Sequence, residues 1–115
     1  MPKFMYQVPF PPSVNHIYQR TKKGVFLTKQ ATDYRLEVMA TIGRGHLTLN
    51  YPLSVSVDLY PPDKRKRDID NTMKALLDAL THAGVWKDDS QIVQLIINRR
   101  DIESPGRALV TVGAA

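Results

Sequence analysis

The 115-residue sequence predicts a single α/β (α+β) domain over residues 1–115, in which a small mixed β-sheet packs against two main helices. Segments that alternate apolar and polar side chains, as strands do, are interspersed with segments whose apolar residues recur at helical spacing. This mixture is typical of helices layered on a sheet. Hydrophobic residues make up 43% of the chain, and its length allows one core without disulfides or a structural metal.

The N-terminal part of the chain predicts a strand, a basic hairpin and a helix. Residues 3–9 alternate as a strand does, and the prolines that follow end it. Residues 16–28 predict two short strands joined by a turn that contains Lys22 and Lys23. Thr28 is an N-cap residue for a first helix, which runs to a pair of glycines. The apolar positions of this helix are Ala31, Tyr34, Val38 and Ile42.

The C-terminal part predicts the rest of the sheet and the second helix. Residues 53–59 alternate strictly, which favours a half-buried strand. The second helix is expected to begin near residues 68–71 and to end at Gly84, a residue suited to a helix C-terminus. Its apolar stripe consists of Met73, Leu76, Leu77 and Leu80. Strands are expected over residues 91–98 and 107–112, separated by a turn.

The amino-acid composition favours some kinds of protein function and excludes others. The formal net charge is +5, which is common among small proteins that bind nucleic acid. The chain has no cysteine, which excludes thiol catalysis, zinc ribbons and a disulfide framework. No apolar run is long enough to span a bilayer or to form a signal peptide. We therefore expect a cytoplasmic protein with no membrane partner.

One segment combines cations and carboxylates in an unusual order. A run of four basic residues leads directly into Asp68 and Asp70, and Lys74 follows one helical turn later. A second acidic pair, Asp88 and Asp89, comes after the second predicted helix. Basic side chains attract phosphates, and paired aspartates bind hard divalent cations. The four basic residues are Lys64, Arg65, Lys66 and Arg67.

This combination suggests metal-dependent cleavage of a phosphodiester. Magnesium usually takes one or two carboxylates together with waters and phosphate oxygens, which Asp68 and Asp70 could supply at the entry of a helix. Asp89 could add a third carboxylate if both acidic pairs meet at one end of the sheet. The Lys74 ammonium could neutralise charge that develops in the transition state.

Simpler interpretations exist for the acidic residues and for Lys74. Asp68 or Asp70 could cap the second helix and favour its dipole. The pair Asp88-Asp89 could be an ordinary solvated turn. Lys74 could form a surface ion pair with a carboxylate four residues away, either Asp70 or Asp78.

The basic and aromatic residues also have simpler interpretations. The four consecutive cations could be a solvated charged run without a ligand. Tyr18 and Phe26 on the basic hairpin could stack on bases or could pack into the core. All the acidic and basic features nevertheless fall within one loop–helix–loop unit, which favours a shared function.

The sequence resembles the RusA-type Holliday-junction resolvases, also called crossover junction endodeoxyribonucleases. The likeness runs from the first predicted strand to the last and includes an N-terminal Pro-Pro-Ser-x-Asn segment. The residues that carry it are Pro11-Pro12-Ser13-Val14-Asn15, Arg67-Asp68-Ile69-Asp70-Asn71, Lys74, Asp78-Ala79-Leu80, Gly84, Trp86 and Asp88-Asp89.

The resemblance implies a small homodimer that cuts four-way DNA junctions by symmetric nicking with Mg²⁺, or Mn²⁺ as a substitute. It implies that Asp68, Asp70 and Asp89 bind the metal and that Lys74 is catalytic. Asp88 belongs to the matching acidic pair. A two-fold dimer would present two identical sites to the two equivalent strands of a junction.

The residues leave two other functions open. One is a metal-dependent nuclease that acts on flaps or plain duplex DNA. The other is a non-catalytic nucleic-acid-binding module whose basic residues bind the backbone while its aspartates only cap a helix. For the junction-resolving function, the expected DNA contacts are the cations Lys22, Lys23, Lys64, Arg65, Lys66 and Arg67.

Overall fold

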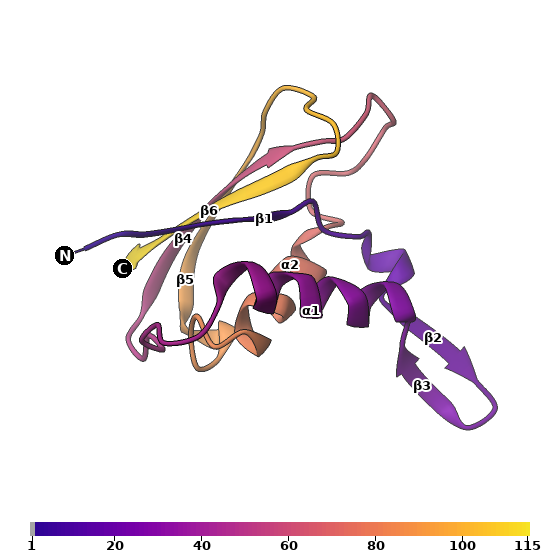
Figure 1. Ribbon diagram of the computed structural model, residues 1–115, viewed down its shortest axis with the longest axis horizontal. Coiled ribbons are helices and arrows are strands. Elements are labelled where there is room, and N and C mark those ends of the chain that lie inside the picture. Colours follow the sequence, from indigo (N-terminus) through magenta and orange to yellow (C-terminus); the bar gives the residue numbers. More distant parts are fainter. Residues whose placement is uncertain (1) are drawn as a thin grey trace.

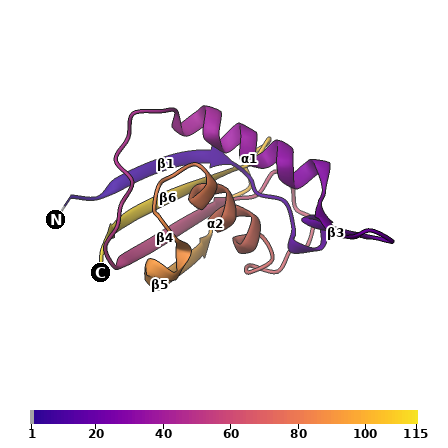
Figure 2. The same ribbon diagram turned by 90° about the horizontal axis from the view of Figure 1, so that it is seen from below.

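A computed structural model, which describes residues 2–115, places both helices on one face of a four-stranded mixed sheet (Figures 1 and 2). Met1 lies outside the described residues. The predicted α+β class is confirmed. In chain order the elements are β1 (Phe4–Pro9), the 3-10 helix η1 (Val14–His16), β2 (Tyr18–Thr21), β3 (Gly24–Leu27), α1 (Lys29–Ile42), β4 (Leu53–Tyr60), α2 (Met73–His82), the 3-10 helix η2 (Asp89–Gln91), β5 (Ile92–Arg99) and β6 (Arg107–Ala114).

The strand order of the main sheet is β1-β6-β4-β5. β6 lies antiparallel to both β1 and β4, whereas β4 and β5 are parallel. A parallel pair needs a crossover connection, and α2 forms this connection between β4 and β5. Because Leu53 is opposite Ile92, the two parallel strands begin at the same end of the sheet.

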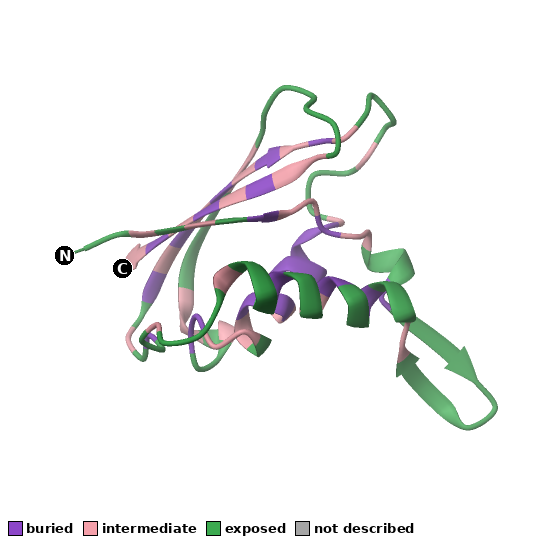
Figure 3. Ribbon diagram, in the orientation of Figure 1, coloured by how far each residue is buried: buried purple, intermediate pink, exposed green. Residues whose placement is uncertain are grey.

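The core lies between the sheet and the two helices (Figure 3). Alternate residues of β4 are buried, as the sequence pattern predicts: Leu53, Val55, Val57 and Leu59. From the helices, Tyr34 and Val38 of α1 and Leu76 of α2 join the same cluster. Trp86 is also buried, and its Nε1–H donates to Thr81 Oγ1 at 2.6 Å. The polar atom of this large side chain is thereby satisfied inside the core.

The ends of the helices follow local sequence signals, with one exception. The Thr28 side chain caps α1 by accepting from the Ala31 backbone N–H, as predicted. At the end of α2, the Gly84 N–H donates to Thr81 O at 3.0 Å while Val85 N–H donates to Leu80 O at 3.1 Å. Gly84 has φ of 81°, so these two bonds form the Schellman motif that favours glycine.

The exception is the start of α2. The helix begins at Met73, and its N-cap residue is Thr72, so the expected start near residues 68–71 is wrong. These residues form a turn instead, in which the Asn71 N–H donates to Asp68 O at 3.2 Å. The Val14 N–H donates to Asn71 O at 2.7 Å and so ties the turn to η1.

Strands β2 and β3 form a separate two-stranded sheet, the predicted basic hairpin, which projects away from the body of the molecule (Figure 1). Its base packs against the body through a small cluster around Ile17, Ala31 and Ala75. Within residues 2–115, no helix has the length and apolarity needed to cross a membrane.

Candidate functional site

The basic loop between β4 and α2 contains one anchored cation and three free ones. The Arg67 guanidinium pairs with Asp63 Oδ1 at 2.9 Å and lies over the Phe10 ring, 5.5 Å from its centroid. The hydrogen bond from Arg67 is the largest cause that holds the pKa of Asp63 below its usual value. The remaining three cations are exposed and form no ion pair with any residue in the described part of the chain: Lys64, Arg65 and Lys66. Arg67 therefore shapes the loop, and the other three are available to a ligand.

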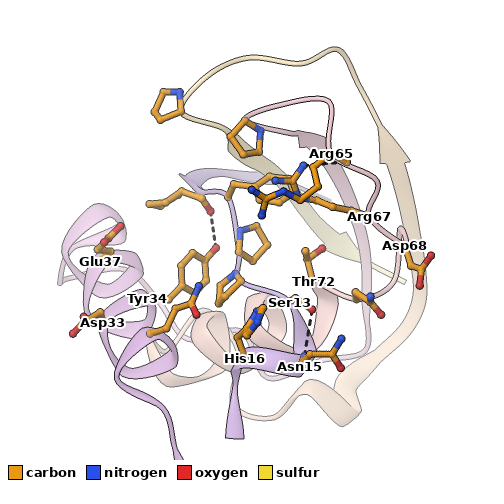
Figure 4. A pocket seen from close by; sticks show the side chains of 18 of the residues that line it. Ser13, Asn15, His16, Asp33, Tyr34, Glu37, Arg65, Arg67, Asp68 and Thr72 are labelled. Carbon is orange, nitrogen blue, oxygen red and sulfur yellow. Dashed lines mark hydrogen bonds between the residues drawn. The ribbon is translucent and has the colours of Figure 1, made fainter.

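The basic loop forms one wall of a groove of about 950 Å³, and the N-terminal part of α1 forms the other wall (Figure 4). The proline-rich segment after β1 lies between them. The Tyr34 hydroxyl of α1 donates to Pro9 O at 2.7 Å, and burial raises the pKa of this phenol well above its usual value. Asp68 lines the groove beside the loop. The groove thus leads from the cations toward the first acidic pair.

Asp68 and Asp70 are exposed in the turn before α2. The backbone of this turn is fixed, because Asp68 O and Asp70 O accept hydrogen bonds from the N–H groups of Asn71 and Met73. Neither carboxylate caps the helix, since the N-cap residue is Thr72. The capping interpretation is therefore wrong for both side chains, although their charge still lies near the helix N-terminus.

Thr72 lies buried between these carboxylates and the helix. Its hydroxyl makes no capping bond, and its Oγ1 has no hydrogen-bond partner among residues 2–115. The residue lines the groove from below the basic loop (Figure 4). Burying a hydroxyl without a hydrogen-bond partner costs folding free energy. The sequence pattern does not predict this position of Thr72.

Lys74 lies in the first turn of α2 and pairs with Asp78 rather than with Asp70. Its Nζ is 3.3 Å from Asp78 Oδ2, and Arg35 of α1 reaches the same oxygen at 3.9 Å. The Asp78 side chain is only 16% exposed, so the solvent screens this pair less than a fully exposed one. The hydrogen bond and charge of Asp78 raise the pKa of Lys74, with smaller contributions from Tyr18 and Asp89.

Asp88 has a structural role in the second acidic pair. Its carboxylate accepts from the Ser90 backbone N–H and from the Ser90 hydroxyl, which lowers the pKa of Asp88. The Gln91 side chain accepts from the Asp88 N–H and completes a capping box for η2. Gln91 Nε2 also donates to the carbonyls of Leu49 and Tyr51, both at 3.0 Å. The segment is therefore built more firmly than the solvated turn of the simpler interpretation.

Asp89, the other member of this pair, does not join Asp68 and Asp70 in one cluster of carboxylates among residues 2–115. It precedes β5, whose start lies opposite the start of β4, whereas Asp68 and Asp70 lie at the N-terminus of α2. No three His, Cys, Asp or Glu side chains among residues 2–115 are grouped closely enough to share a metal ion. The expected meeting of both pairs at one end of the sheet is thus not seen. Asp89 is nevertheless near enough to Lys74 to raise its pKa.

Comparison with known proteins gives a match along nearly the whole chain. The family model for endodeoxyribonuclease RusA matches residues 9–113. The crossover junction endodeoxyribonuclease RusA of Escherichia coli (strain K12) is 32% identical over 114 residues, which cover 97% of this chain and 95% of that protein.

The corresponding protein of Enterobacteria phage 82 is 33% identical over 107 residues, which cover 91% of this chain and 89% of the relative. The crossover junction endodeoxyribonuclease RusA of Shigella sonnei (strain Ss046) is 32% identical over 114 residues, with 97% and 95% covered. The matched region contains the basic loop, both acidic pairs and the lysine of α2. This chain belongs to the RusA endodeoxyribonuclease family.

Proposed function

We propose that this protein is a magnesium-dependent endodeoxyribonuclease that resolves four-way DNA junctions by paired symmetric nicks. The observation that carries the proposal is that the cations of the basic loop and the carboxylates of the following turn are adjacent. Three free cations of the basic loop lead directly to two exposed carboxylates that serve no capping role. The names of the relatives support the same activity. The cytoplasm is its proposed place of action.

The basic residues would hold the DNA backbone. Lys64, Arg65 and Lys66 are exposed and form no ion pair within residues 2–115, so each can neutralise a phosphate without breaking a salt bridge. Lys22 and Lys23 at the tip of the hairpin would contact a more distant part of the same DNA. Arg67, which was also expected to bind DNA, would act mainly by fixing the shape of the loop, because Asp63 and Phe10 already engage its guanidinium.

The acidic residues fit magnesium by their chemistry. Asp68 and Asp70 offer exposed carboxylate oxygens, and waters and phosphate oxygens usually complete the shell of this ion. Asp89 is the third candidate ligand, and its side chain would have to move toward Asp68 and Asp70 when the metal binds, because these three carboxylates are not grouped closely enough to share an ion among residues 2–115. Magnesium, or manganese in its place, would supply Lewis acidity toward the phosphate and would lower the pKa of a bound water. Asp88 would act indirectly, by holding the turn that presents Asp89.

Lys74 would supply the positive charge that the protein itself contributes near the scissile phosphate. Its ammonium lies in the first turn of α2, immediately after the acidic turn. Positive charge placed where negative charge develops stabilises a transition state more than the ground state. Asp78 would keep Lys74 protonated and restrict its motion, and Arg35 would satisfy Asp78 whenever the lysine turns toward a phosphate.

A homodimer would supply two sites for the two strands that must be cut. β5 is an edge strand of the main sheet, and three of its apolar side chains are exposed: Val93, Leu95 and Ile96. Residues 92–97 of this edge carry no charged side chain, and an exposed apolar edge of this kind can pair with another strand. We infer that a second copy covers this edge in a two-fold arrangement.

A panel of substrates tests the proposed function. The protein is incubated with a synthetic four-way junction, a flap and a linear duplex, first with magnesium and then with EDTA. We expect paired nicks at symmetric positions on the junction, only with magnesium. Equal cutting of the flap or duplex would favour a nuclease of another specificity, and binding without any cutting would favour a non-catalytic module.

A further inference from the structure

The β2–β3 hairpin exposes large apolar side chains that are not packed into the hydrophobic core. It projects from the body and is exposed except near its base (Figure 3). Tyr18 is 47% exposed, Val25 57% and Phe26 52%. Their exposure rules out the alternative that Tyr18 and Phe26 pack into the core. An isolated two-stranded hairpin is marginally stable in water, so exposed apolar groups here suggest a ligand.

The strand register divides these side chains between two faces. Residues directly opposite each other share a face, and so do residues two apart on one strand. Tyr18 is opposite Leu27 and Arg20 is opposite Val25, so these four residues form one face, which we name the inner face. Phe26 lies opposite Gln19 on the other face, which we name the outer face.

The inner face adjoins the candidate active site. Leu27 packs against the cluster that contains Ala75 of the first turn of α2. The neighbouring residue of that turn is Lys74, and the Tyr18 phenol is near enough to contribute to the raised pKa of this lysine. A group that lies on the inner face would therefore be close to the catalytic lysine.

The charge of the hairpin indicates an anionic partner. No aspartate or glutamate occurs in the sequence before Asp33. Arg20, Lys22 and Lys23 are exposed, and within residues 2–115 none of them forms an ion pair. An aromatic and aliphatic surface bordered by free cations is the arrangement that binds unpaired nucleotides, since the bases stack while the cations hold the phosphates.

We propose that the inner face of the hairpin is a stacking platform for unpaired bases at a DNA branch point, with the Tyr18 ring as its principal contact. This inference rests on the proposed function and deepens it. Bases within a duplex are already stacked and cannot lie on a protein ring, whereas bases at a branch point can leave the stack. The platform would thereby favour junctions over duplex DNA and place the branch beside Lys74.

The test compares variants of the two hairpin faces. A junction carrying 2-aminopurine at the branch point is titrated with protein in EDTA, so that no cutting occurs, and a duplex carrying the same label is titrated in parallel. The variants are Tyr18→Ala and Tyr18→Phe on the inner face, with Phe26→Ala as the matched aromatic control on the outer face. Circular dichroism and thermal unfolding establish that each variant is folded.

We expect the wild type, Tyr18→Phe and Phe26→Ala to change the fluorescence of the branch-point label. Tyr18→Ala should leave this fluorescence unchanged and lose about tenfold in junction affinity, as is typical of one lost base–ring stack, with duplex affinity kept. An equal loss on junction and duplex would overturn the proposal. Equal effects of Tyr18→Ala and Phe26→Ala, or failure of Tyr18→Phe to retain binding, would also overturn it.

Three further outcomes separate this inference from related ones. If Tyr18→Ala changes the oligomeric state in sedimentation, the hairpin is a protein–protein contact and the stacking proposal is wrong. If the wild type cuts no junction but the label responds as expected, the platform is supported while the proposed catalytic function fails. If the wild type cuts junctions and Tyr18→Ala behaves identically in every assay, the platform fails while the function stands.

Discussion

Replacement of the three free cations of the basic loop by glutamine should weaken junction binding and flatten its dependence on salt. The structure identifies these residues, because Lys64, Arg65 and Lys66 are exposed and unpaired within residues 2–115 whereas Arg67 is held by Asp63. Each phosphate that a cation neutralises releases condensed counterions. The triple variant should retain the fold, since none of the three side chains is buried.

The magnitude follows from the number of cations removed. Each phosphate contact contributes about 0.9 to the slope of log K against log salt, so three contacts contribute about 2.7 per chain. Between about 50 mM and about 200 mM salt, this difference in slope corresponds to about 40-fold in affinity. The wild type should therefore lose about 40-fold more affinity than the triple variant over this range if one chain contacts the junction, and on the order of 10³-fold more if both chains of the proposed dimer do.

Fluorescence anisotropy of a labelled junction, measured over a series of potassium chloride concentrations, gives both slopes. The control variant removes three exposed cations outside the loop, Lys3, Arg44 and Lys87, so that net charge falls equally. The reasoning is refuted if the loop variant keeps the wild-type slope, or if the control variant flattens the slope as much as the loop variant does.

Three further perturbations test other parts of the account. Asp78→Asn should lower the pKa of Lys74 toward its usual value, so the decline of the cleavage rate at alkaline pH should begin at lower pH. Junction affinity at neutral pH should not change. If the alkaline part of the pH–rate profile does not move, Asp78 does not keep Lys74 protonated. Leu76→Ala should cost about 2–5 kcal/mol of unfolding free energy in urea, because Leu76 is fully buried against the sheet, and a loss below about 1 kcal/mol would contradict the described core. Val93→Lys should convert the dimer to monomer in sedimentation, and a dimer as tight as the wild type would reject the β5 edge as the interface.

The local elements could be predicted because the relevant signals are local. The alternation over residues 53–59, the N-cap Thr28 and the terminal Gly84 each specify a conformation of a few residues, and the structure confirms all three. The order of strands could not be predicted, since β6 pairs with β1 and β4 across long stretches of sequence. The start of α2 was misplaced because Asp68 and Asp70 are good N-cap residue types, but contacts with η1 hold their segment as a turn.

The candidate site was predicted in its residue types more than in its arrangement. The sequence identifies the cationic loop and the exposed carboxylates, but Arg67 and Asp88 proved to be held by neighbours, which depends on side-chain hydrogen bonds that no spacing rule reveals. The buried hydroxyl of Thr72 and the position of Tyr18 near Lys74 depend on tertiary packing and were missed for the same reason.

The central claim is that the exposed carboxylates of the acidic turn perform chemistry rather than binding. Comparison of Asp70→Asn with the wild type tests it most directly, with cutting and binding measured on the same four-way junction. The loss of a carboxylate should abolish magnesium-dependent nicking, while junction affinity measured in EDTA should stay at or above the wild-type value because no phosphate-binding cation is removed. Full nicking by Asp70→Asn, or loss of binding and cutting in equal measure by the folded variant, would contradict the account.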